Sequence, residues 1–116
     1  MTLLTETELA IKNTKHVPGH ITFIGSADGV YSCSWLQFVK LADFSYDPGF
    51  GAQKVASDLV IMFSDGLVMS RHEYDGSECW SYNRPINVQI PGKPIVNLCV
   101  DQIGAIGWRT LEALNG

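Results

Sequence analysis

The sequence predicts a single α+β domain over residues 1–116, with an antiparallel sheet of four to six strands and a helix packed on it. The length is that of one ordinary domain. A composition of 46% hydrophobic and 17% charged residues is typical of a packed globule. Short β-rich segments between residues 58 and 82 are separated by two Asp-Gly pairs, which tight hairpins favour. These segments predict a central three-stranded meander.

Helical signals occur before and after the predicted sheet. Thr5 and Glu8 match the T-x-x-E capping box and predict a short helix over residues 6–13. The segment 34–42 carries apolar residues at i, i+3, i+4 and i+7, and Ser34 is available as its N-cap. The closing segment "GWRTLEALNG" predicts a short C-terminal helix that ends at Asn-Gly.

Further strands are expected on both sides of the meander. Residues 21–24 and 30–33 flank a Gly-Ser-Ala-Asp-Gly turn and predict a hairpin. Residues 95–100 follow Pro94, which cannot donate a backbone hydrogen bond, and predict one more strand. The segment "SYDPGFGAQ" contains three residues that break regular structure and predicts an ordered loop.

The Asp-Gly pairs also predict the register of the meander. A two-residue loop at Asp75-Gly76 sets Arg71 opposite Trp80 and Glu73 opposite Glu78. The same loop at residues 65–66 sets Asp58 opposite Glu73, so three acids share one face. Facing carboxylates destabilise a sheet, so either a basic ligand balances them or the register is different.

Strand alternation assigns the opposite face of the meander to the core. His72, Tyr74 and Cys79 are expected there, packed against the helix at 34–42. A cysteine beside a histidine can be a nucleophile and its base, although two buried neighbours in a small sheet are the more common case. A small-molecule-binding or enzymatic pocket lined by these three residues is therefore the alternative function.

Charge and composition narrow the classes of partner. The net charge of −4 is concentrated between residues 43 and 78, where seven acids stand against Lys54 and Arg71. Such a patch repels phosphates and attracts basic proteins, so direct nucleic-acid binding is not expected. No apolar run approaches bilayer length and the N-terminal segment carries glutamates, so neither a membrane span nor a signal peptide is expected and a cytoplasmic location is predicted.

No metal or cofactor is expected. Three widely spaced cysteines without a C-x-x-C pair favour free, buried thiols over a disulfide framework or a zinc site. Pro18-Gly19 separates His16 from His20, so the two histidines lack the helical presentation of a ligand pair and are expected to be solvated or capping.

The segments "DLVIMFSDG", "SRHEYDGSECWSYNRP" and "GWRTLEAL" resemble the small acidic immunity proteins of bacterial contact-dependent growth-inhibition systems. The resemblance implies an antitoxin that covers the active site of a basic toxin domain, often a nuclease, and it implies no catalytic residue. Aromatic residues within the acidic segment are consistent with such a protein-binding surface. The residues expected to contact the partner are Asp47, Phe50, Asp58, Arg71, Glu73, Asp75, Glu78, Trp80 and Tyr82.

Overall fold

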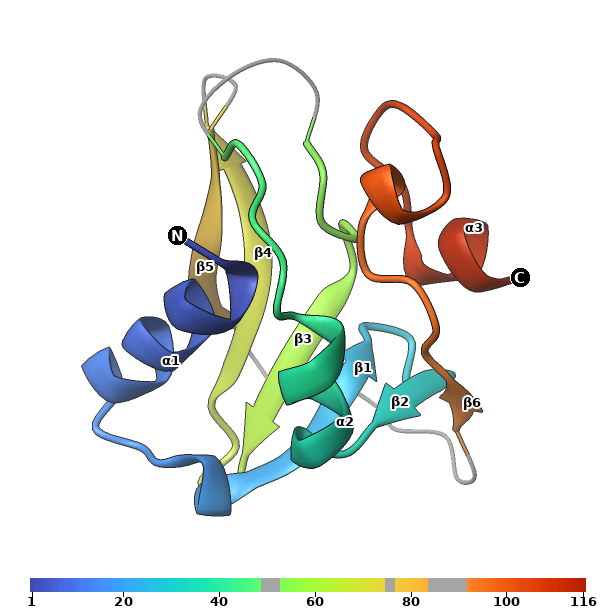
Figure 1. Ribbon diagram of the computed structural model, residues 1–116. Helices are drawn as coiled ribbons and strands as arrows, with labels where there is room; N and C mark the ends of the chain where they lie inside the picture. Colours follow the sequence, from blue (N-terminus) through green and yellow to red (C-terminus); the bar gives the residue numbers. More distant parts are fainter. Residues whose placement is uncertain (49–52, 75–76, 84–91) are drawn as a thin grey trace.

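The fold is a single α+β domain with a six-stranded sheet and three α-helices, as the sequence predicts (Figure 1). It was obtained as a computed structural model that describes residues 1–48, 53–74, 77–83 and 92–116. The elements in chain order are α1 (Leu3–Asn13), η1 (Pro18–His20), β1 (Ile21–Ser26), β2 (Tyr31–Cys33), α2 (Trp35–Leu41), β3 (Leu59–Phe63), β4 (Val68–Tyr74), β5 (Ser77–Asn83), β6 (Lys93–Pro94), η2 (Val100–Gln102) and α3 (Leu111–Asn115).

The strand order in the sheet is β5-β4-β3-β1-β2-β6. All neighbouring pairs are antiparallel except β2 and β6, which are parallel, so the sheet is mixed. The expected strand over residues 95–100 is wrong: the strand is the two-residue β6, and Cys99 forms only an isolated bridge with Val55. Ile95, Leu98 and Val100 are buried against the core instead, which explains the apolar pattern of this segment.

Two of the three α-helices, α1 and α3, begin at residues other than those expected, whereas α2 begins as expected. α1 begins three residues earlier than predicted because Thr2, and not Thr5, is its N-cap and accepts a hydrogen bond from the Thr5 amide. α2 begins after Ser34 as expected, with a capping box between Ser34 and Gln37. α3 begins only at Leu111, so Trp108 precedes the helix and donates its indole hydrogen to the Val55 carbonyl.

The two hairpins of the meander have different loops. β4 and β5 pair in the predicted register, with Arg71 opposite Trp80 and Glu73 opposite Glu78. β3 and β4 are shifted by one residue from the prediction, with Val60 opposite Ser70, so Glu73 does not face Asp58. The cause is a three-residue loop, Ser64 to Gly66, in which Gly66 has φ 91°.

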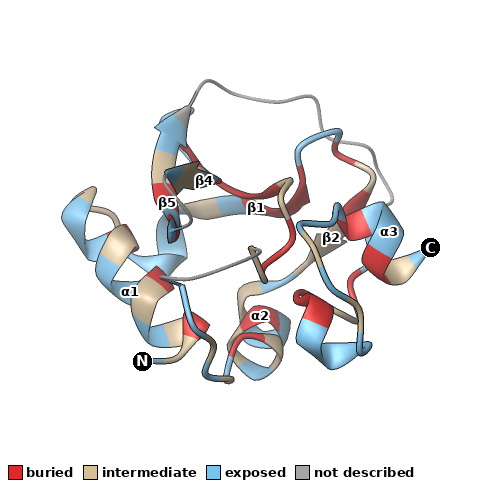
Figure 2. Cartoon of the chain, turned by 90° about the horizontal axis from the view of Figure 1, so that it is seen from above, coloured by how far each residue is buried: buried red, intermediate tan, exposed pale blue. Residues whose placement is uncertain are grey.

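The one-residue shift reverses the predicted faces of β4 and β5, because side-chain direction alternates along a strand. Arg71, Glu78 and Trp80 lie on the core face with Ile61 and Met69. The three α-helices lie along this face, and the buried residues are concentrated between helices and sheet (Figure 2). A smaller apolar cluster of Phe23, Val60, Met62 and Val68 lies on the opposite face, which we call the outer face.

Candidate functional site

Arg71 is the centre of a buried ion network between α1 and the sheet. Its side chain is 0% exposed and donates to Glu6 Oε2 at 2.6 Å, to Tyr46 Oη at 2.9 Å and to Glu78 Oε1 at 3.1 Å. The guanidinium carbon lies 4.9 Å from the centre of the Trp80 ring. One cation thus lies between two carboxylates and over an aromatic face, an arrangement that stabilises a charge removed from water.

Glu78 extends this network to the backbone. Its two carboxylate oxygens accept hydrogen bonds from the Lys54 amide at 2.6 Å and the Val55 amide at 3.1 Å. The Glu78 amide in turn donates to the Pro48 carbonyl. The segments around residues 48 and 54 are therefore fixed against the β4–β5 hairpin by one residue, the first through the Glu78 backbone and the second through its buried side chain.

Burial and charge act in opposite directions on the ionisation of the network. Burial alone lowers the pKa of Arg71, but the negative charges around it, Glu6 first, raise its pKa above the ordinary value. Burial also raises the pKa of the Tyr46 phenol well above its usual range, so Tyr46 stays neutral and donates to Glu6 while it accepts from Arg71. Arg71 is therefore always charged in the folded protein.

The network corrects the predicted contact surface. Arg71, Glu78 and Trp80 are 6%, 5% and 9% exposed and cannot meet a partner. Trp80 donates its indole hydrogen to Thr7 Oγ1 at 3.0 Å, which closes the core against α1. Asp58 is half-buried and accepts from the Leu111 amide, and burial raises the pKa of its carboxyl.

The other predicted contact residues have different positions. Phe50 and Asp75 lie outside the described residues. Asp47 is exposed, Glu73 is half-buried and Tyr82 is half-exposed. Tyr74, which the sequence assigns to the core, is 77% exposed at the end of β4, and the shifted register of the meander accounts for the error.

Four charged residues and Tyr74 lie near the end of the β4–β5 hairpin: Asp47 and Asp101 are exposed, Lys54 and Glu73 are half-buried, and the exposed Tyr74 ends β4 on the outer face. The Glu78–Pro48 and Glu78–Lys54 hydrogen bonds bring two distant segments to this end. Lys54 Nζ donates to Asp101 Oδ1 at 3.0 Å, and Asp101, with a smaller contribution from Asp47, raises the pKa of Lys54. We call this region the hairpin-end surface, and its members are Asp47, Lys54, Glu73, Tyr74 and Asp101.

The alternative site at His72 and Cys79 does not form the expected pocket. The two residues are opposite each other in the β4–β5 ladder, but both are exposed on the outer face, away from α2. Within the described part of the chain neither side chain has a hydrogen-bond partner that would activate or orient it. Tyr74 lies on the same outer face, so the three residues that were expected to line the pocket do not face α2.

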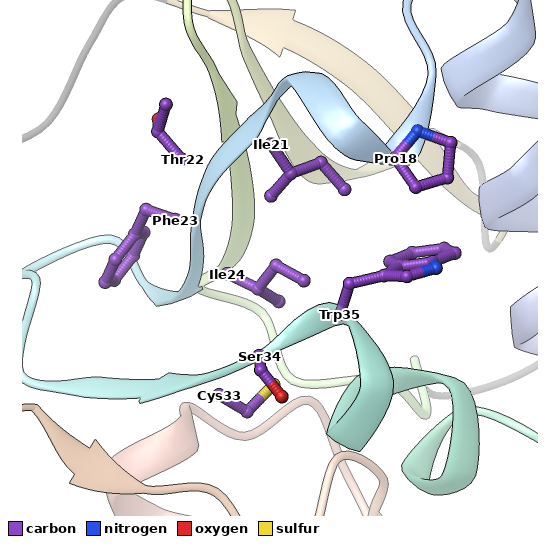
Figure 3. A pocket seen from close by; sticks show the side chains of 8 residues that line it. All are labelled: Pro18, Ile21, Thr22, Phe23, Ile24, Cys33, Ser34 and Trp35. Carbon is purple, nitrogen blue, oxygen red and sulfur yellow. The ribbon is translucent and has the colours of Figure 1, made fainter.

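A different pocket, of about 230 Å³, lies where β1, β2 and the start of α2 meet. Figure 3 shows Ile21, Ile24 and Trp35 directed into it. Polar and apolar atoms contribute about equally to its wall, and the hydroxyls of Thr22 and Ser34 are already engaged with the backbone. Burial raises the pKa of its one thiol, Cys33, to about 12, so this cysteine is no nucleophile at neutral pH.

His20 is exposed and accepts from the Val17 amide at the start of η1, as expected of a solvated or capping histidine, but the structure also brings its ring against that of His16, which the sequence interpretation did not expect. His16 Nδ1 and His20 Nδ1 are 3.0 Å apart, and His16 Nε2 is 2.9 Å from Asp65 Oδ2. The β3–β4 loop supplies Asp65, a position that residue spacing along the chain could not connect with the histidines. Among the described residues no group of three or more His, Cys, Asp or Glu side chains is arranged around one point as a metal cage.

Comparison of the chain with protein-family models, curated proteins and solved structures gave no match. None of the helices in the described ranges is long and apolar enough to cross a bilayer.

Proposed function

We propose that this protein binds and inhibits a basic protein partner, as an immunity protein does, through the hairpin-end surface. The observation that carries the proposal is the composition of this surface: three carboxylates, Asp47, Glu73 and Asp101, accompany one ammonium group and a tyrosine that is 77% exposed. Acidic groups attract a basic partner and orient it, and an exposed aromatic ring supplies contact area at small entropic cost.

The buried network supports the proposal because it holds the surface in place. Glu78 binds the backbone at Lys54 and Pro48, the segments that carry or adjoin Asp47 and Lys54. Arg71 fixes the Glu78 carboxylate by donating a hydrogen bond to it inside the core. A surface that is ordered before binding loses less conformational entropy in the complex, which increases affinity.

The direct test uses the protein encoded by the neighbouring gene, because immunity genes lie beside the genes of the toxins that they neutralise. The neighbouring product, or its C-terminal domain, is expected to stop growth of a bacterial host when expressed alone. Co-expression of this protein is expected to restore growth, and the two purified proteins are expected to form a complex that weakens as salt increases. A neighbouring product that does not bind this protein contradicts the proposal.

Variants then locate the surface. The double variant Asp47→Lys/Glu73→Lys is expected to weaken binding at least about 10-fold, mainly through slower association. The matched control, Glu8→Lys/Glu112→Lys, changes the net charge equally at exposed positions on α1 and α3 and is expected to alter the affinity less than about 2-fold. Equal losses in the two double variants would show that only the overall charge matters and would refute this surface.

A further inference from the structure

The facing nitrogens of His16 and His20 form an unusual contact on the side of the molecule away from the hairpin-end surface. The two Nδ1 atoms are 3.0 Å apart, and the rings meet edge to face at an interplanar angle of 84°. His16 follows α1, His20 ends η1, and Asp65 comes from the β3–β4 loop. Three separate segments thus place two imidazoles and a carboxylate in one row.

The fold holds the His16 ring and the backbone of His20. The His16 ring stacks on Phe63 with centroids 4.4 Å apart and planes within 6°, and its side chain is only 12% exposed. His20 is fixed through its backbone, since its amide donates to Val17 and its carbonyl accepts from Ser64. Packing therefore fixes the His16 ring, whereas the exposed His20 ring has a fixed backbone and is positioned by its contacts with His16 and the Val17 amide.

The hydrogen-bond partners define the state of each nitrogen. A carboxylate can only accept, so His16 Nε2 carries the hydrogen that Asp65 Oδ2 receives, which in neutral His16 leaves Nδ1 with a lone pair. His20 Nδ1 accepts a long hydrogen bond, 3.4 Å, from the Val17 amide, so this nitrogen carries no hydrogen, and a cation would take its single lone pair in place of the amide. Two lone pairs 3.0 Å apart repel unless a proton or a metal cation lies between them.

We propose that His16 and His20 bind one divalent transition-metal ion of the zinc class through their Nδ1 atoms. Two imidazole nitrogens on a tetrahedral zinc ion are about 3.3 Å apart, so the rings need to separate by only a few tenths of an ångström. Asp65 is the carboxylate that orients His16 from the far side of the ring, an arrangement that recurs behind zinc-bound histidines. Nitrogen ligands select this class of ion over magnesium and calcium.

A cavity of about 320 Å³ adjoins His16, and His20 lies outside its lining. Glu8, Lys12 and His16 contribute to its wall. Two protein ligands make an open site of moderate affinity, in contrast to the closed four-ligand sites that hold structural zinc. The negative charge of Glu8 attracts a cation near this cavity and the positive charge of Lys12 repels one. Neutralisation of Glu8 is therefore expected to lower the metal affinity, and neutralisation of Lys12 to raise it.

The test is a zinc titration of the full-length Cys79→Ser variant, which removes the exposed thiol as a competing ligand. Calorimetry is expected to give one ion per chain. His20→Gln is expected to weaken binding at least about 10-fold. Asp65→Asn is expected to weaken it by about 10- to 100-fold, because the Asn Oδ1 still accepts from the Leu67 amide while its NH2 group replaces Oδ2 and cannot accept from His16. His72→Gln, at the third histidine of the chain, is the matched control and is expected to leave binding unchanged.

His20→Gln is the decisive variant because His20 is exposed. His16 packs on Phe63, so replacement of His16 can unfold the protein. Nuclear magnetic resonance supplies a second readout: zinc is expected to shift the Nδ1 signals of His16 and His20 and not those of His72. Absence of stoichiometric binding, or equal binding by His20→Gln, would overturn the proposal. Loss of binding with His20→Gln but not with Asp65→Asn would retain the histidine pair and refute the role of the carboxylate.

Discussion

Replacement of Arg71 by methionine tests whether the buried ion network holds the fold together. The substitution keeps much of the side-chain volume but removes the hydrogen bonds to Glu6, Tyr46 and Glu78 and the cation over Trp80. Glu6, with a side chain 21% exposed, can recover water. Glu78 cannot, because its side chain is 2% exposed and keeps only two backbone donors.

The expected cost follows from that stranded carboxylate. Removing one partner of a buried ion pair typically costs about 3 to 5 kcal/mol, because the other charge remains in the interior. For a chain of this length the loss corresponds to a decrease in Tm of about 10 to 20 °C. The additional change Glu78→Gln removes the stranded charge, so the double variant is expected to be less destabilised than the sum of the two single variants by at least about 1 kcal/mol.

Urea denaturation followed by tryptophan fluorescence measures these differences, provided that the slope of the transition is unchanged. Arg109→Met is the matched control, since Arg109 is exposed and its Nε donates only to the Ile106 carbonyl. It is expected to change the free energy of unfolding by less than about 0.5 kcal/mol. If Arg71→Met lay within about 1 kcal/mol of the wild type, the network would not be a structural element and the reasoning would be refuted.

Three further predictions follow from backbone geometry and thiol exposure. Gly25→Ala places a Cβ 1.8 Å from a backbone oxygen of β2 and is expected to destabilise the protein by more than about 4 kcal/mol, whereas Gly19→Ala meets no atom within 4 Å and should leave the Tm unchanged. Lys15 has φ 65°, so Lys15→Gly is expected to raise the free energy of unfolding by about 1 kcal/mol in urea denaturation. Cys79 is expected to be the one thiol that reacts with Ellman's reagent before denaturation, at a rate that His72→Ala does not change; a slower variant would indicate activation by the histidine.

Local sequence signals predict the elements of this fold but not the faces of its meander. An Asp-Gly pair fits a two-residue loop and also the end of a three-residue loop, because both require a residue with positive φ. β4 and β5 pair in the register of a two-residue loop at residues 75–76, whereas Asp65-Gly66 ends a three-residue loop. The unbalanced row of acids in the predicted register is the one sign in the sequence that the loop at residues 65–66 is not a two-residue loop.

The buried network could not be predicted because its members are far apart in the chain. Arg71 meets Glu6 across 65 residues and Tyr46 across 25. No periodicity connects such positions, and a strand with alternating charges and aromatics is typical of a binding surface as well as of an internal ion network. Only the burial of Arg71 and Glu78 separates the two interpretations.

This burial also decides which variants can test a binding surface. Arg71 and Glu78 are charged residues of the β4–β5 hairpin and are obvious targets for mutation. Their replacement would release the backbone around Lys54 and so displace the hairpin-end surface. A partner would then be lost although neither side chain touches it. Loss of binding in those variants therefore does not distinguish a lost contact from a displaced backbone. Asp47 is exposed and Glu73 is half-buried, so reversal of their charges disturbs the core less and measures recognition more directly.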